Sequence, residues 1–203
     1  MSVDFLCETG HVPSDRIYSP KQGTGSQFSA FNVPGANLAI QDFVEVDVEA
    51  NRLDDGGLST VSVRVASVLA YVVLKILAFQ DRHENKDAYD LVYTLVNFPD
   101  DGPHAAGQAA AISAVRGESQ VDGALQLLAQ RFGSPQHDGP SAYANFLAQP
   151  EDAIRREQLR NEAVLAVGQF LDSAGHWKRR MSEGGSKGYC RGFGVEGASD
   201  GFS

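Results

Sequence analysis

The chain has 203 residues, a length that suits one domain or one domain with a smaller appended part. Its hydrophobic fraction of 42% is sufficient for a packed core and excludes wholesale disorder. The formal net charge of −9 disfavours a general nucleic-acid-binding protein, which would present a net basic surface.

The N-terminal region predicts short strands set among loops. Residues Val3–Cys7 form a short apolar segment that carries one acid, Asp4, and they predict a strand. Residues 9–35 are rich in Gly, Ser and Pro and predict a loop, with a short strand near residues 27–32. Because a lone strand cannot bury both of its faces, a strand at Val3–Cys7 is expected to have neighbours.

Two alternating segments follow and predict a β-hairpin. Hydrophobic and polar residues alternate over 43–48 and again over 61–65, and turn-forming residues at 53–57 separate the two segments. This alternation is typical of half-buried strands. The acids Glu45 and Asp47 are expected to face solvent.

From Ser67 onwards the hydrophobic periodicity becomes helical. Ser67 is a suitable N-cap for a helix that ends near Arg82 and is apolar on nearly all sides. A second helix is predicted from about residue 86 to 97, with Asp87 in its first turn, where a negative charge favours the helix dipole. Four more helices are predicted at residues 105–115, 120–132, 141–148 and 151–174.

Three further features of the sequence concern disorder, cysteine chemistry and membrane association. The glycine-rich segment 182–203 predicts a disordered tail. Cys7 and Cys190 have neither metal-ligand spacing nor the pattern of a disulfide framework. The apolar run 68–79 is interrupted by Lys75 and is too short to cross a bilayer. We therefore expect a cytoplasmic protein without a membrane partner.

Lys75 is the most informative single residue, because its helix places apolar neighbours on every side of it. A half-buried ammonium group needs a partner, since an unpaired buried charge is costly. Asp87 and Asp90 are three residues apart and share one face of the next helix. A helical hairpin would bring Lys75 opposite Asp90. Such a pair either clamps a phosphate beside a carboxylate or is a purely structural ion pair.

The spacing of these residues carries a resemblance to a known family. Two motifs resemble those of the AbiEii/AbiGii toxin family of nucleotidyltransferases: Lys75, Ala78 and Arg82, and then Asp87 and Asp90 within Asp-Ala-Tyr-Asp-Leu. The resemblance is strongest over residues 63–98 and extends back to Val3.

The resemblance implies a polymerase-beta-like nucleotidyltransferase fold and a reaction. That reaction is Mg²⁺-dependent transfer of a nucleotide from an NTP to an acceptor such as tRNA, often in a toxin that has a cognate antitoxin as partner. By resemblance, Lys75, Asp90 and Asp87 are catalytic residues, Lys75 and Arg82 bind the nucleotide, and Asp4 binds the metal. Arg82 also suits a helix end, where a cation is favourable in any protein.

One motif of the family has no counterpart in this chain. Gly25–Ser26 is not followed at a suitable distance by an Asp-x-Asp pattern, so the resemblance implies a chain that begins partway through the nucleotidyltransferase fold. Two alternatives remain open: a non-catalytic family member that keeps the helical core, and an unrelated helical protein with an accidental match. We expect an α+β fold with a partial sheet region at 1–66, a helical domain at 67–181 and the tail at 182–203.

Overall fold

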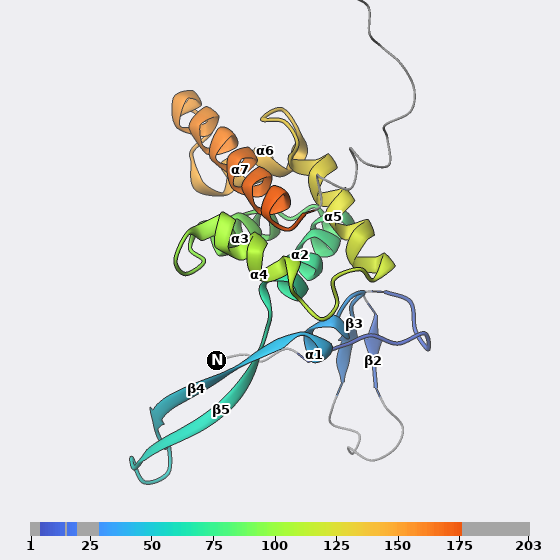
Figure 1. Ribbon diagram of the computed structural model, residues 1–203, viewed down its shortest axis with the longest axis vertical. Helices are drawn as coiled ribbons and strands as arrows, with labels where there is room; N and C mark the ends of the chain where they lie inside the picture. Colours follow the sequence, from blue (N-terminus) through green and yellow to red (C-terminus); the bar gives the residue numbers. More distant parts are fainter. Residues whose placement is uncertain (1–4, 15, 20–28, 176–203) are drawn as a thin grey trace, which may run out of the picture.

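The computed structural model describes residues 5–14, 16–19 and 29–175 (Figure 1). Within these residues two small sheets lie in the N-terminal part and are followed by a mostly helical region, so the predicted α+β class is confirmed. Asp4, Gly25–Ser26 and the tail at 182–203 lie outside the described residues.

The first sheet is small and is held together around a buried amide. It contains β1 (Leu6–Cys7), β2 (Ile17–Tyr18) and β3 (Ala30–Asn32), in the order β1-β3-β2, with β3 parallel to β1 and antiparallel to β2. The Asn32 side chain donates to the carbonyl oxygens of Thr9 at 3.0 Å and Val12 at 2.7 Å, and it accepts from the Thr9 N–H at 2.8 Å. A buried amide satisfied in this way fixes the loop after β1 against the sheet.

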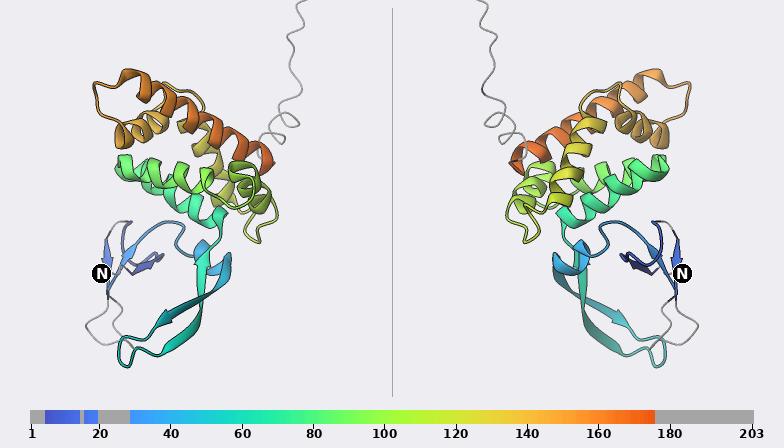
Figure 2. Two further views of the ribbon diagram at one scale, coloured as in Figure 1. Left: turned by 90° about the vertical axis from the view of Figure 1, so that its left-hand side faces the viewer. Right: turned by 90° about the vertical axis from the view of Figure 1, so that its right-hand side faces the viewer.

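The second sheet is a long β-hairpin that projects away from the helices (Figures 1 and 2). A single short helix, α1 (Leu38–Gln41), leads into β4 (Phe43–Asn51), which pairs antiparallel with β5 (Leu58–Ala66). The prediction of half-buried strands is wrong, because the valines of both strands are 42–56% exposed. The acids Glu45 and Asp47 do face solvent, as expected.

The helical region contains all six predicted helices. They are α2 (Val68–Arg82), α3 (Asn85–Val96), α4 (Gly102–Ala111), α5 (Ser119–Phe132), α6 (Asp138–Leu147) and α7 (Ala153–Ser173). The long helix α7 packs against α4, α5 and α6, while α3 lies between α2 and α6. No helix in the described part of the chain is long and apolar enough to span a membrane.

The helix ends show which local signals were informative. Ser67 caps α2 as predicted, because its hydroxyl oxygen accepts from the Ala70 N–H at 3.3 Å. Two helices, α4 and α6, begin three residues earlier than predicted. Their first turns contain Pro103 and Pro140. The N–H groups of a first turn have no acceptor within the helix, so a proline, which lacks an N–H, costs no hydrogen bond there.

The contact between α4 and α7 depends on a residue without a side chain. A Cβ atom on Gly107 would lie 2.5 Å from the Phe170 carbonyl oxygen and 2.5 Å from the Ser173 Cβ. We expect Gly107→Ala to lower the free energy of unfolding by about 1–3 kcal/mol, because the two helices must separate. The matched control is Gly123→Ala in α5, where a Cβ meets nothing within 4 Å and should stabilise the helix by about 0.5–1 kcal/mol. Urea unfolding of both variants measures the difference, and equal effects would contradict the close helix contact.

Candidate functional site

A tight turn between α2 and α3 sets the geometry of the site. The helix α2 ends at Arg82 and is capped by His83, which adopts a left-handed conformation with φ of 54° and donates its N–H to the Phe79 carbonyl oxygen at 3.0 Å. The helix α3 begins two residues later, at Asn85. The chain therefore reverses at once, and the last two turns of α2 face the first two turns of α3.

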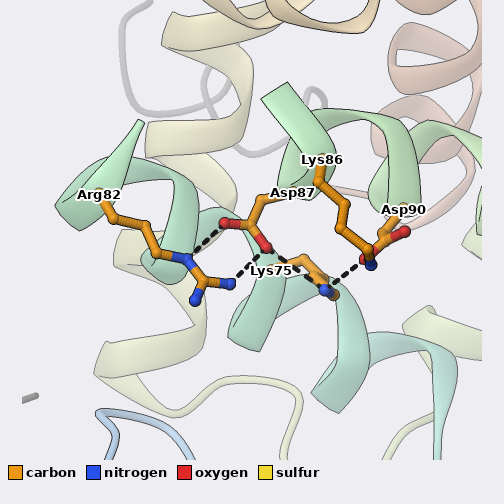
Figure 3. A network of polar contacts seen from close by, with 5 residues as sticks. All are labelled: Lys75, Arg82, Lys86, Asp87 and Asp90. Carbon is orange, nitrogen blue, oxygen red and sulfur yellow. Dashed lines mark hydrogen bonds and ion pairs between the residues drawn. The ribbon is translucent and has the colours of Figure 1, made fainter. Parts of the chain in front are cut away.

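This reversal gathers five charged side chains, which we call the ion-pair network: Lys75, Arg82, Lys86, Asp87 and Asp90 (Figure 3). Lys75 Nζ lies 2.7 Å from Asp90 Oδ2 and 3.3 Å from Asp87 Oδ1. The predicted pairing of Lys75 with Asp90 is therefore confirmed. The Lys86 ammonium contacts the same Asp90 oxygen at 2.7 Å.

Asp87 is the buried centre of the network. Its side chain is 1% exposed, and the Arg82 guanidinium donates to it in a two-pronged manner, from Nε at 2.7 Å and Nη2 at 2.8 Å. Its place in the first turn of α3, predicted from the sequence, adds a favourable interaction with the helix dipole. Both Asp87 oxygens accept hydrogen bonds from cations, so this carboxylate holds Lys75 and Arg82 in position.

The charges of the network stabilise one another. Burial by itself would lower the pKa of Lys75, but the hydrogen bond to Asp90 and the nearby charges raise it above the ordinary value. Burial would likewise raise the pKa of Asp90, but the hydrogen bonds from Lys75 and Lys86 hold it below the ordinary value. Both pKa shifts favour the state in which Lys75 and Asp90 are charged.

These shifts predict how Asp90 contributes to stability as the pH changes. A carboxyl group whose pKa is lower in the folded state stabilises the fold above its unfolded pKa, and this contribution is lost as the pH falls through the folded pKa. We expect Asp90→Asn to cost about 1–2 kcal/mol near pH 7, because Lys75 loses a charge-assisted hydrogen bond. The cost should shrink as the pH falls below the ordinary value of 3.8. Urea unfolding of both proteins across the acid range measures it, and a constant difference would contradict this assignment.

The exposed side of α2 borders a pocket of about 530 Å³. Lys75 and Arg82, seven residues apart on α2, both line this pocket. The opposite wall comes from the N-terminal segment, through Leu6, Ser14, Val33 and Pro34. The pocket therefore combines apolar walls with two cations, whose side chains are 20% and 59% exposed.

Two further residues shape the charge of the pocket. Tyr71 lines it, and the Lys75 ammonium lies 5.7 Å from the centre of the Tyr71 ring. Asp81 also lines the pocket and contributes one negative charge beside Arg82. An anion would thus be attracted by Lys75 and Arg82 and repelled by Asp81.

The described residues do not fit a divalent metal ion at this site. Asp87 and Asp90 are the carboxylates nearest to Lys75, and their oxygens accept from three cations, which would repel Mg²⁺. In the part of the chain that the structure describes, no group of three or more His, Cys, Asp or Glu residues could hold a metal. Asp4, the residue that the resemblance assigns to the metal, lies outside that part.

Sequence reasoning identified the polar half of the site and missed the apolar half. Lys75, Arg82, Asp87 and Asp90 were all predicted, and the structure brings them together. The pocket residues of the N-terminal segment were not predicted, because their approach to α2 depends on a contact between distant parts of the chain. No signal in the sequence marks this approach; in the structure it is visible at Gly35, where φ is +84° and a Cβ would lie 3.4 Å from the Leu77 side chain.

Comparison with known proteins identifies no family for this chain. The chain matches no protein-family description, no curated protein and no solved structure.

Proposed function

We propose that this protein is a nucleotidyltransferase that binds an NTP in the pocket beside α2, with the triphosphate toward Lys75 and Arg82. The observation that carries the proposal is the position of these two cations. Both line a pocket of about 530 Å³, and a single buried carboxylate, Asp87, holds both of them in place. A pocket of this size is in the usual range for small-molecule sites.

The chemistry of nucleotidyl transfer matches these side chains. An acceptor hydroxyl oxygen bonds to the α-phosphorus of the NTP while the bond from that phosphorus to pyrophosphate breaks, so negative charge develops on the departing phosphates. Lys75 and Arg82 would stabilise that charge, and Asp87 and Asp90 would keep the Lys75 ammonium aimed and protonated. The apolar wall formed by Leu74, Leu77 and Ala78 would receive the base or the sugar.

A second candidate function is nucleotide binding without transfer. It is favoured by the engagement of both Asp87 and Asp90 with cations, which leaves neither carboxylate free for the metal that the family reaction uses. In this alternative the same pocket binds the nucleotide, and the protein acts through a partner such as an antitoxin.

One set of experiments separates the candidates. The full chain is incubated with each labelled NTP, with and without Mg²⁺, in the presence of total tRNA. Label transfer to an acceptor supports the nucleotidyltransferase. A thermal shift induced by an NTP without label transfer favours the binding protein, and the absence of both results would overturn both candidates.

A further inference from the structure

The β4–β5 hairpin separates its side chains into two unlike faces. One face, which we call the valine face, contains Val44, Val46 and Val48 of β4 and Val61, Val63 and Val65 of β5. The pairing register places these six side chains in three directly opposed pairs: Val44 with Val65, Val46 with Val63, and Val48 with Val61. All six are 42–56% exposed.

The other face of the hairpin is charged. Glu45, Asp47 and Glu49 project from β4 on this side, and Arg64 of β5 lies opposite Glu45, with its Nε 3.2 Å from the Glu45 carboxylate. The same guanidinium lies 4.4 Å from the centre of the Phe43 ring. This acidic face is thus suited to solvent.

Within the residues that the structure describes, no second layer covers the valine face as its side-chain pattern requires. Strict alternation of valine with polar residues is the pattern of a sheet that is covered on one face. A two-stranded hairpin alone is only marginally stable in water, and a row of exposed valines is also prone to association. The hairpin projects away from the helical region (Figure 2), and the exposure of its six valines makes the valine face accessible to a second molecule.

We propose that the valine face is a dimer interface, on which the valine face of a second copy of this chain packs. The charge distribution argues for a copy. The valine face carries no charge over its whole length, including Ala50 and Ser59 at its far end, so two copies meet without like-charge repulsion despite the net charge of −9. In this arrangement both acidic faces point outward to solvent.

The symmetry of the valine face argues for the same occupant. The Val46–Val63 pair lies midway between the two outer pairs. A twofold axis that runs between the two sheets, perpendicular to the strands and level with this middle pair, places the Val44–Val65 pair of one copy on the Val48–Val61 pair of the other. Such a contact is self-complementary and closes after two copies. The two hairpins would form a sandwich with a sheet spacing of about 10 Å.

The size of the hairpin sets the expected strength of the dimer. Nine residues per strand span about 30 Å, and two strands are about 10 Å wide, which gives roughly 300 Å² of contact face on each copy. This is less than the roughly 800 Å² per partner that stable complexes bury. The dimer should therefore be weak, with a dissociation constant on the order of 10 to 100 μM.

Sedimentation velocity of the full chain at about 1 to 300 μM tests the proposal. The wild-type mass should rise toward twice the monomer mass as the concentration increases. Val63→Glu and Val63→Lys, next to the twofold axis, should each remain monomeric because like charges face each other. An equimolar mixture of these two variants should restore the dimer, since the charges are then opposite.

The matched control is Ser62→Lys, which lies next to Val63 on the same strand but on the acidic face, directly opposite Asp47, where a cation is favourable. This variant should dimerise like the wild type. Circular dichroism and thermal unfolding verify that each variant keeps its helical fold. A wild type that stays monomeric throughout would overturn the proposal. So would Val63 variants that dimerise normally, a mixture that stays monomeric, or a Ser62→Lys variant that loses the dimer.

Discussion

The substitution Asp87→Asn is expected to lower the free energy of unfolding by about 3 kcal/mol. The Asp87 carboxylate is 1% exposed and accepts from both Lys75 and Arg82. An asparagine keeps the shape but removes the charge, and its amide group turns a donor toward cations that have only donors. The cost stays near the lower end for a broken buried ion pair, because Lys75 keeps Asp90 as a partner and the Arg82 side chain is 59% exposed to water.

The matched control for this prediction is Asp138→Asn. Asp138 also pairs with an arginine, Arg131, but its side chain is 39% exposed, so the loss should remain below about 1 kcal/mol. Urea unfolding monitored by circular dichroism compares the two variants with the wild type. Equal losses in both variants would show that burial does not strengthen the role of Asp87.

Asp87 also illustrates what the sequence predicts and what it leaves open. Its position in the first turn of α3 follows from the helix pattern, and its separation from Asp90 places both on one face. Its burial does not follow, because burial depends on how closely α3 lies against α2. That distance is set by the left-handed His83, a residue type that gives only a weak signal for such a turn.

For the hairpin, the sequence predicts the strands correctly but not the exposure of their valines. Its two strands and its solvent-facing acids follow from alternation, since side chains in a strand point to opposite faces in turn. The expected cover over the valines is not found within this chain's described residues, where the six side chains remain 42–56% exposed. Alternation indicates that a face should be covered, but it cannot indicate whether the cover belongs to the same chain.

The pocket was also predictable from the sequence only in part. Lys75 stands out in the sequence because an isolated cation within an apolar helix requires a partner. The N-terminal wall does not stand out, because Leu6 and Val33 have the composition of ordinary strand and loop residues. Only their packing beside α2 makes a pocket of them.

The substitution Lys75→Met should separate a binding role for this ammonium from a structural one. Methionine fills a similar volume, and the network keeps partners without Lys75, because Asp87 retains Arg82 and Asp90 retains Lys86. The loss of stability should therefore be modest. If an NTP binds as proposed, this variant should lose the NTP-induced thermal shift and about 10²–10³-fold of any transfer rate, since a donor to the developing charge is removed.

Lys86→Met is the control that makes the result interpretable. Lys75 and Lys86 both contact Asp90 Oδ2 at 2.7 Å, but the Lys86 side chain is 66% exposed and does not line the pocket. The two variants remove the same charge from the same carboxylate, so an effect transmitted through Asp90 should appear in both. An effect confined to Lys75→Met is therefore not transmitted through Asp90, and it supports a direct contact of Lys75 with the ligand if the thermal unfolding of the free protein shows that the Asp87–Arg82 pair is kept. Equal retention of the thermal shift in both variants would show that Lys75 is only a structural partner of Asp87 and Asp90, and the pocket would then need another cation to hold a triphosphate.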